Sequence, residues 1–469
     1  MSESLFARLG REPGEVAVLG LGKSGLAVAA LLKRDGYAVY ASDAGSSAAA
    51  TANAEQLRAL GVDASVGTHD LARIARSAVV VVSPGVPPTA SPIVTAAAHG
   101  VPVVGEMEIA LQAMPVLHYI ATTGTNGKTT TTALVGHMLR ALGHAAVDAG
   151  NIGTALADVA LRRPQPQWAA LECSSFQLHD TPGIKPTVGV VTNLSPDHLD
   201  RYDSLDAYYH DKALLFANAS AQSRWVLNGD DEAVLHLHAR LGRGDDALPG
   251  RVYTFRIGAP ADAWYDTDRR ELHLLGAPLL HRDDLGLVGD HNVANALTAA
   301  LAVSVANEAH QTPAARAVLA DALRSFHALA HRLEPVPTSD GRLWLNDSKA
   351  TNVSSTLVAV QGMNRPFVLL LGGRHKGEAY TALAAPFAST GKVVLAFGEA
   401  AADIVHDHGP LVRVEKVDGA FADVIARARS LTSAGDAVLL SPACSSYDMF
   451  RNYEERGAAF RRLAQGASE

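Results

Sequence analysis

The stretch Thr122-Thr123-Gly124-Thr125-Asn126-Gly127-Lys128-Thr129-Thr130 carries the strongest structural signal in this sequence. The apolar run 117–121 precedes it and an amphipathic helical pattern follows it. Strand, glycine-rich turn and helix in this order predict a loop whose N–H groups cradle phosphate oxygens. Lys128 adds positive charge and Thr129 a hydroxyl for Mg²⁺. The spacing is unusual, because Thr122 stands where the first glycine is expected, and a plain glycine turn with an exposed lysine is the alternative.

Bulk properties indicate a large cytoplasmic protein. At roughly 100–200 residues per domain, 469 residues predict two to four domains. The net charge of −8 argues against nucleic acid or an anionic membrane as the main partner. Two cysteines, no leading signal segment and no run of about 18 apolar residues predict a reducing compartment without membrane insertion. Motifs for zinc proteolysis and serine hydrolysis do not occur.

Strand and helix patterns alternate in three blocks, which predicts an α/β protein with parallel sheets. We expect a Rossmann-like N-terminal domain at 1–114, a central P-loop-type ATP-binding domain with a mostly parallel sheet at 115–329, and a Rossmann-like C-terminal α/β domain at 330–469. The expected strands are 16–19, 37–41, 79–82, 117–121, 168–171, 188–192, 225–227, 343–345, 367–371, 393–397 and 438–440.

A second glycine motif lies in the first block. Gly20-Leu21-Gly22-Lys23-Ser24-Gly25 fits G-x-G-x-x-G after a strand and before a helix that we expect at 26–34. Asp43 ends the next strand, where an acid can meet a ribose or a base edge. The motif therefore predicts a bound pyrophosphate, as in NAD, FAD or a UDP-sugar.

Two metal-ligand candidates follow strands of the second block. Glu172 stands at the carboxyl end of 168–171, where a carboxylate can bind Mg²⁺ beside the loop threonine. His198 lies in the segment 193–200 and could bind metal or phosphate. Alone, Glu172 could be a solvated strand-end acid and His198 an ordinary hydrogen-bonding residue.

Lys212 stands on the apolar face of an expected helix that Ser204 caps. It falls three and four residues after Tyr209 and Tyr208, within the stripe that includes Phe216. Burial favours a neutral amine, which can capture CO₂ as a carbamate and so become an anionic Mg²⁺ ligand. The alternative is a lysine that extends its amine to water.

Polar clusters also stand near other expected strand and helix ends. The segment 290–295 precedes an alanine-rich helix expected at 295–305, where its amides could cap the helix or recognise an adenine edge. The segments 346–352, 372–376 and 441–448 lie at or after strands of the third block. Such strand ends hold ligands in α/β domains, although each segment could also be a turn.

Together these segments resemble the Mur ligase family of peptidoglycan synthesis over almost the whole chain. The likeness is closest to its glutamate-adding branch. It rests on the phosphate loop and on five further segments: 150–153, 172–178, 197–202, 346–352 and 440–448 running to Arg456-Gly457.

The resemblance implies the following ATP and metal sites. The phosphates would meet the loop residues Gly124, Thr125, Asn126, Gly127, Lys128, Thr129 and Thr130. Two Mg²⁺ ions would be held by Thr129, Glu172, His198 and carbamylated Lys212. The nucleotide would also meet Asn292, Asn295, Arg332 and Asp347. The catalytic set would be Lys128, Glu172, His198, Lys212 and Lys349.

It also implies the substrates, UDP-N-acetylmuramoyl-L-alanine and D-glutamate, and an ATP-dependent carboxylate–amine ligase that acts through an acyl phosphate. The substrate contacts would be Lys23, Ser24, Asp43, Gly85, Asn151 and Ser174, with Lys349, Thr351, Lys376, Ser446, Tyr447 and Tyr453 around the glutamate. The sequence departs from the family after Asp43, where Ala44 and Gly45 replace a frequent hydroxyl and arginine. Tyr453 replaces a common phenylalanine.

Three other functions remain open at this point. One is another amino-acid ligase of the Mur or folylpolyglutamate type. Another is an NAD-dependent dehydrogenase using the first block, which would leave the second loop unexplained. The third is a nucleotide-regulated binding module. For the ligase we expect a cytoplasmic monomer whose domains close around ATP, with roles in cell wall synthesis, cell shape and cell division.

Overall fold

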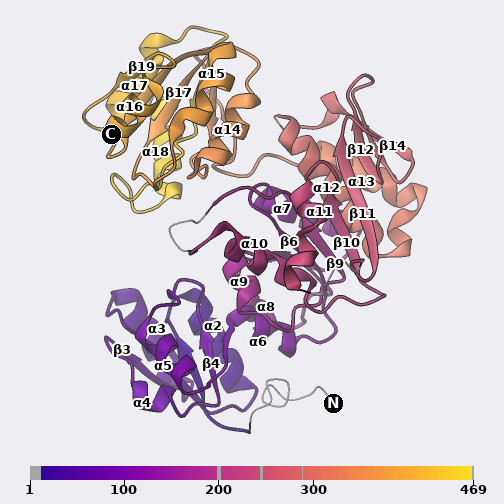
Figure 1. The fold of residues 1–469 in the computed structure, drawn as a ribbon, viewed down its shortest axis with the longest axis vertical. Coiled ribbons are helices and arrows are strands. Elements are labelled where there is room, and N and C mark those ends of the chain that lie inside the picture. The colour runs from indigo at the N-terminus through magenta and orange to yellow at the C-terminus, as the bar shows by residue number, and fades with distance from the viewer. Residues whose placement is uncertain (1–11, 198–201, 243–246, 288, 467–469) are drawn as a thin grey trace.

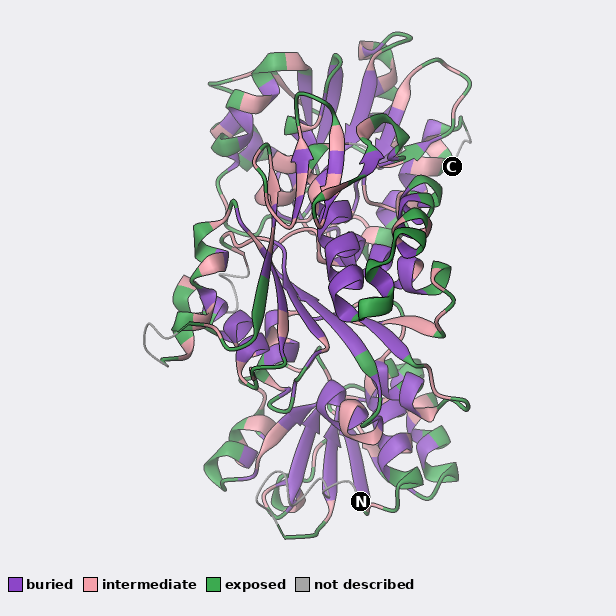
Figure 2. Ribbon diagram, turned by 90° about the vertical axis from the view of Figure 1, so that its right-hand side faces the viewer, coloured by how far each residue is buried: buried purple, intermediate pink, exposed green. Residues whose placement is uncertain are grey.

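A computed structural model describes residues 12–197, 202–242, 247–287 and 289–466. The chain forms three α/β units in a row, with the N-terminal and C-terminal units at opposite ends of the central one (Figure 1). Each unit contains one β-sheet, and the described strands form sheets of five, nine and six strands. Figure 2 shows that the strands are mostly buried, while exposed residues gather on the outer faces of the helices. The expected α/β class is confirmed.

The first sheet is parallel, and its order β3-β2-β1-β4-β5 matches five of the six strands of the dinucleotide-binding fold. Its strands are β1 (Val16–Leu19), β2 (Val39–Asp43), β3 (Asp63–Val66), β4 (Val79–Val82) and β5 (Val103–Gly105). Its helices are α2 (Lys23–Arg34), α3 (Ala48–Ala59), α4 (Leu71–Ile74), α5 (Ser91–Ala98) and α6 (Glu106–Ala113). The order reverses between β1 and β4, and ligands of such sheets bind beyond the strand ends at this point.

The central sheet has the order β14-β13-β12-β11-β10-β9-β6-β8-β7. Its parallel strands are β6 (His118–Thr123), β7 (Ala146–Gly150), β8 (Trp168–Glu172), β9 (Val188–Val191), β10 (Arg224–Asn228), β11 (Arg251–Ile257) and β12 (Ala263–Asp266). Strands β13 (Glu271–Leu274) and β14 (Ala277–His281) add an antiparallel edge. The sheet is therefore mostly parallel, as expected.

Helices cover both faces of the central sheet. They are α7 (Lys128–Ala141), α8 (Leu156–Leu161), α9 (Ser175–His179), α10 (Leu205–Ala213), α11 (Glu232–Leu235), α12 (Asp290–Ala306) and α13 (Pro313–Ser325), with 3₁₀ turns at Leu214–Phe216, Leu237–Leu241, Arg282–Asp284 and Glu308–Gln311. Helix α12 is almost wholly buried, which its alanine and leucine content allows. Among the described residues, no helix is both long enough and apolar enough to span a bilayer.

The third sheet has the order β15-β16-β20-β17-β18-β19, with β15 antiparallel and the rest parallel. Its strands are β15 (Glu334–Val336), β16 (Leu343–Asn346), β17 (Phe367–Gly372), β18 (Gly391–Phe397), β19 (Val414–Lys416) and β20 (Ala437–Leu440). Its helices are α14 (Val353–Gln361), α15 (Ala384–Thr390), α16 (Ala401–His408), α17 (Phe421–Leu431) and α18 (Tyr453–Ala464), with a 3₁₀ turn at Tyr380–Leu383.

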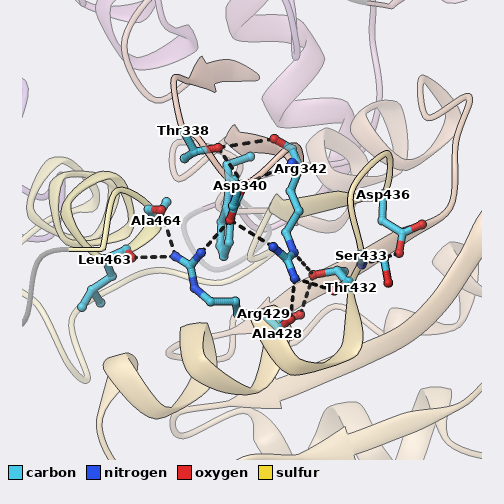
Figure 3. A network of polar contacts seen from close by, with 11 residues as sticks. Thr338, Asp340, Arg342, Ala428, Arg429, Thr432, Ser433, Asp436, Leu463 and Ala464 are labelled. Atoms are coloured by element: carbon cyan, nitrogen blue, oxygen red, sulfur yellow. Dashed lines mark hydrogen bonds and ion pairs between the residues drawn. The ribbon is translucent and has the colours of Figure 1, made fainter.

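A polar network joins the amino-terminal edge of this sheet to the ends of α17 and α18 (Figure 3). Arg429 donates to Asp340, at 2.6 Å, and to the carbonyl oxygens of Leu463 and Ala464. Arg342 donates to the Thr432 carbonyl at 2.7 Å and lies 3.3 Å from Asp340. Both guanidinium groups therefore have a carboxylate partner, and the network ties the helix ends to the sheet.

All eleven expected strands are present, within a few residues of the predicted ends. Strands β1 and β4 have the predicted bounds, whereas β2 begins at Val39 instead of Tyr37. Helix α2 begins at Lys23, three residues earlier than expected, because Gly22 already stands at the N-cap. The strands that were not predicted are β3, β5, β7, β11 to β15 and β19. Most of them are short or alternate between apolar and polar residues, so they carry little apolar signal.

Candidate active site

The phosphate loop connects β6 to α7 and needs glycine at two positions. Gly124 has φ +134°, and a Cβ there would lie 2.1 Å from the Thr192 hydroxyl oxygen. Gly127 has φ +81°, and its Cβ would lie 2.3 Å from Oδ1 of Asn295. Side chains at either position would both strain the backbone and clash. The loop therefore packs closely against the segment after β9 and against α12.

The segment after β9 holds the loop through a paired set of hydrogen bonds. Asn126 N donates to Asn193 Oδ1 at 2.9 Å, and Asn193 Nδ2 returns a bond to the Asn126 carbonyl at 3.0 Å. Thr192 Oγ1 donates to the same carbonyl at 2.6 Å. These contacts fix the loop, so its amides at the start of α7 are preorganised for an anion.

Two lysines converge on the Gly124 carbonyl. Lys128 Nζ donates to it at 3.0 Å and to the Thr125 carbonyl at 2.7 Å. Lys212 Nζ donates to it at 2.7 Å and lies 4.5 Å from the centroid of the Tyr208 ring. Lys212 is 1% exposed, so the alternative of a lysine that reaches water is wrong. Ser204 caps its helix as expected, accepting from Ala207 N at 3.1 Å.

Burial sets the charge state of this lysine pair. Burial and then the nearby Lys128 charge hold the pKa of Lys212 well below its usual value. Burial also lowers the pKa of Lys128, although Glu172 and Asp197 oppose the shift. A neutral Lys212 amine is the form that can react with CO₂.

Glu172 is the buried carboxylate nearest to the loop. It pairs with Thr122 across strands β8 and β6, at the carboxyl end of the sheet. Its Oε1 accepts from Asn151 Nδ2 at 2.9 Å, whereas its Oε2 is buried without a hydrogen-bond partner. Burial alone would raise the pKa of Glu172, but Lys128 and Arg332 hold it below its usual value. An ionised carboxylate with one oxygen unsatisfied suits a divalent cation.

The donor set fits Mg²⁺ better than a preformed transition-metal site. Among the described residues, no three His, Cys, Asp or Glu side chains converge on one point. Mg²⁺ needs only one or two carboxylates when phosphate oxygens complete its shell. Thr129, whose hydroxyl accepts from Arg332, lies in the first turn of α7 beside Glu172. His198 lies outside the described residues, so its place near the metal stays a prediction.

A cavity of about 190 Å³ lies between the phosphate loop and the third unit. Part of the predicted nucleotide set lines this cavity, whereas Gly124, Thr125, Lys128 and Thr129 do not. The lining residues from that set are Asn126, Gly127, Thr130, Asn292, Asn295, Arg332 and Asp347, with Lys349 beside them. The prediction that 290–295 precedes a helix is wrong, because α12 begins at Asp290. Asn292 and Asn295 sit one turn apart on that helix and are hydrogen-bonded to each other at 3.1 Å.

Residues of the third unit reach the phosphate loop directly. Ser355 Oγ donates to Asn126 Oδ1 at 2.8 Å, and Asn126 Nδ2 donates to Ser354 Oγ at 3.2 Å. Arg332 contacts Thr129, as noted above. Burial raises the pKa of Asp347 to about 7, although it accepts from Ser441 Oγ at 2.8 Å. The two serines were not predicted, since nothing local in their sequence marks a contact 228 residues away.

A cavity of about 660 Å³ lies at the switch point of the first sheet. It brings together Lys23, Ser24, Asp43, Gly85 and Asn151, which the sequence assigned to one substrate. Asp43 already accepts from Leu21 N at 2.7 Å and from Gly45 N at 2.8 Å, so it also shapes the glycine loop. His69 lines the cavity as well and was missed, because a lone loop histidine carries no local signal.

The predicted amino-acid residues surround the carboxyl end of the third sheet. Lys376 Nζ donates to Thr351 Oγ1 at 3.3 Å, and Lys349 Nζ lies 5.3 Å from the centroid of the Tyr453 ring. Burial, and then Arg332, lower the pKa of Lys349 to about 8. Ser446 is buried in the segment after β20.

Two of the predicted substrate residues lie differently. Tyr447 is 65% exposed and projects to solvent. Ser174 caps α9, accepting from Gln177 N at 3.2 Å and donating to Gln177 Oε1 at 3.1 Å. The local structure thus gives Ser174 a capping role whatever it binds.

Three family models match the chain in succession. They are the Mur ligase MurD-like N-terminal domain at residues 14–105, the Mur ligase middle domain at 122–303 and the Mur ligase glutamate ligase domain at 331–444. Similar proteins include UDP-N-acetylmuramoylalanine–D-glutamate ligases of Pelotomaculum thermopropionicum, 37% identical, and Anaeromyxobacter dehalogenans, 39% identical. Each alignment covers 96% of this chain and 97% of the relative.

This chain belongs to the Mur ligase family. Solved structures show the same fold at low identity. The UDP-N-acetylmuramate–alanine ligase MurC of Thermotoga maritima matches with a TM-score of 0.57 and 20% identity, over 95% of this chain and 98% of that one. MurF of Acinetobacter baumannii matches with a TM-score of 0.58 and 16% identity, over 86% and 88%. The three-unit arrangement of this Mur ligase is thus that of its family.

Proposed function

We propose that this Mur ligase adds D-glutamate to UDP-N-acetylmuramoyl-L-alanine with the hydrolysis of ATP to ADP and phosphate. The observation that carries the proposal is the likeness to ligases of that name at 37–39% identity across 96% of the chain. The match to a glutamate ligase domain supports the choice of amino acid. The product would enter peptidoglycan synthesis, and through it cell shape and division, in the cytoplasm.

We assign one substrate to each unit, with domain boundaries at 1–114, 115–329 and 330–469. The first unit binds the UDP-sugar in the cavity of Lys23, Ser24, Asp43, Gly85 and Asn151. The second holds ATP at the phosphate loop, and the third supplies Arg332 and Asp347 to the nucleotide. The third also binds D-glutamate between Lys349 and Lys376. The ligase acts as a monomer, since one chain supplies all three sites.

The reaction would proceed in two steps at the phosphate loop. The substrate carboxylate attacks the γ-phosphate, which gives an acyl phosphate and ADP. The amine of D-glutamate then attacks the acyl carbon and phosphate leaves. Lys128 and Arg332 stabilise the charge that develops on the transferred group, because both are held beside the loop by buried contacts. Lys349, whose pKa is lowered to about 8, would offset the negative charge of the acyl phosphate near the incoming amine.

Two Mg²⁺ ions, when bound, would neutralise phosphate charge and polarise the transferred group. Thr129 and Glu172 would hold one ion. Glu172, His198 and the Lys212 carbamate would hold the second. The carbamate would place a negative charge at Lys212, which is neutral as the free amine, and that charge would complement the nearby Lys128. The neutral amine and its place 2.7 Å from the loop carbonyl support this step.

A coupled assay tests the proposed function. ADP release should require both UDP-N-acetylmuramoyl-L-alanine and D-glutamate, and mass spectrometry should show one glutamyl residue added to the UDP-sugar. A binding module would release no ADP under any combination, and a dehydrogenase would instead bind nicotinamide nucleotide at the first cavity. Either result would overturn the proposal.

A further inference from the structure

Arg456 is a fully buried arginine in the first turn of α18. Its Nε donates to Ser348 Oγ at 3.0 Å and its Nη2 to the Ser348 carbonyl at 2.8 Å. Both Nη atoms donate to the Cys444 carbonyl at 3.1 Å. Nη1 also lies 3.4 Å from the carbonyl oxygens of Ser445 and Gly372. One side chain thus joins the ends of three strands, β16, β17 and β20.

The segments that Arg456 joins also carry the proposed glutamate contacts. Ser348 directly precedes Lys349, Ser445 directly precedes Ser446, and Gly372 opens the loop that reaches Lys376. These segments pack closely around the guanidinium group. A Cβ at Gly373 would lie 2.2 Å from the Ser445 carbonyl oxygen and 3.1 Å from Nη1 of Arg456. A shift of the guanidinium group would therefore move the backbone on either side of the pocket.

Arg456 has hydrogen-bond acceptors but no carboxylate partner in the described part of the chain. No carboxylate oxygen there forms an ion pair with it, and Asp448 acts on it only through space. Burial lowers the pKa of Arg456 to about 10, so it stays protonated at neutral pH. Arg429 in the same unit differs, because it has Asp340 at 2.6 Å as well as two carbonyl acceptors (Figure 3).

Carbonyl dipoles alone leave the charge of a buried cation only partly offset, so it acts on its surroundings at short range. The loops that Arg456 joins carry Lys349 and Lys376, and Asp448 is the one carboxylate of the described residues whose charge acts on Arg456. An amino acid with an anionic side chain gains from that field, whereas its amide analogue does not.

We propose that Arg456 is a positioning and specificity residue for the acidic amino acid. The hydrogen bonds of its guanidinium group hold the three loops of the pocket in place. Its charge, which has no carboxylate partner among the described residues, favours a side-chain carboxylate. The inference rests on the proposed function and deepens it. The two roles of Arg456, positioning and charge, can be separated by substitution. A lysine keeps the charge but lacks the planar set of donors that arginine has.

The test compares Arg456→Met, Arg456→Lys and the control Arg429→Met in the full-length enzyme. Arg429 is matched because it also donates to carbonyl oxygens of the third unit, but at the opposite end of the sheet. The measured quantities are kcat, the KM values for D-glutamate and ATP, the inhibition constant of D-glutamine and the thermal midpoint.

For Arg456→Met we expect the KM for D-glutamate to rise about 30-fold, with the KM for ATP changed less than about threefold. The ratio of the D-glutamine inhibition constant to the D-glutamate KM should fall about tenfold. Arg456→Lys should keep that ratio within about threefold while raising the KM about tenfold, because charge returns without the planar set of donors. Arg429→Met should lower the thermal midpoint and leave both constants unchanged.

Three results would overturn the inference: an unchanged glutamate KM in Arg456→Lys, an unchanged ratio in a folded Arg456→Met, or equal losses in Arg429→Met. If Arg456→Met does not fold, the lysine variant still decides. The wild type is measured in parallel. Absence of glutamate-dependent turnover there would overturn the proposed function itself, whereas normal wild-type turnover with unaffected variants would overturn only the role of Arg456.

Discussion

The two glycine-rich loops of this Mur ligase share a strand–loop–helix plan but are held differently. Loop 20–25 is fixed within its own unit, where Ser83 Oγ donates to the Gly20 carbonyl and Asp43 accepts from Leu21 N. Loop 124–129 is fixed by its own sheet and also by Arg332, Ser354 and Ser355 of the third unit. Lys23 on the first loop is exposed, while Lys128 on the second folds back on the loop.

This difference agrees with the proposed roles of the two loops, substrate binding at the first and reaction at the second. The first loop presents its cation to a cavity that is complete within the contact between the first two units. The second lies against the third unit, whose Arg332, Asp347 and Lys349 line the same cavity as the loop. Changes at the first loop should therefore alter UDP-sugar affinity, and changes at the second should alter turnover.

The largest effect is expected at Lys128. Lys128→Ala removes the cation that we assign to the transferred phosphate and should lower kcat about a thousandfold, as loss of a buried charge stabiliser does. Calorimetry should show unchanged affinity for the UDP-sugar, because we assign that substrate to the other loop. Near-normal turnover of the variant would show that residues 124–129 do not bind the reacting phosphate.

Lys212 tests the carbamate. Lys212→Ala should lower kcat about a hundredfold, and formate or acetate should restore part of it by filling the anionic position. The control is Lys185→Ala, an exposed lysine of the same unit, which should be fully active and insensitive to the acids. Full activity of the wild type in CO₂-free buffer, together with no rescue, would contradict the carbamate.

The backbone of the first loop can be tested with two alanines. A Cβ at Gly25 would lie 1.7 Å from the Gly20 carbonyl oxygen, whereas a Cβ at Gly22 would have no other atom within 4 Å. Gly25→Ala should destabilise the enzyme by about 3 kcal/mol in urea unfolding, and Gly22→Ala by less than about 0.5 kcal/mol. Equal unfolding free energies would mean that the close helix–strand approach is not needed.

The smallest effect is expected at Lys23. Lys23→Ala should weaken UDP-sugar binding about tenfold and leave the KM for ATP unchanged, since an exposed charge makes a modest contribution to pyrophosphate binding. Lys33→Ala, an exposed lysine at the far end of the same helix, is the matched control and should bind normally. A loss of kcat in Lys23→Ala would break the distinction between the two loops.

Local signals in the sequence predicted the three α/β units and both glycine loops, and they placed Lys212 on an apolar helix face without deciding whether its amine is buried. Apolar runs such as 79–82 predict buried strands. A lysine on an apolar helix face is conspicuous in the sequence, because charged residues are rare there. Contacts between distant segments were not predictable in this way. Ser354, Ser355 and Arg456 read as ordinary helix residues, and only the fold brings them to the loop or to the ends of three strands. Helix α12 begins at Asp290, earlier than predicted. Its N-cap is Gly289, with φ +87°, and the local sequence does not reveal that backbone conformation.

The central claim is that the two loops and the third unit together join one acidic D-amino acid to the UDP-sugar. Phosphate release with ATP, Mg²⁺ and UDP-N-acetylmuramoyl-L-alanine, measured across a panel of D- and L-amino acids, tests it most directly. The account predicts release with D-glutamate and little with L-glutamate, D-glutamine or any other member of the panel. Release that is equal with an L-amino acid, or that needs no amino acid, would contradict it.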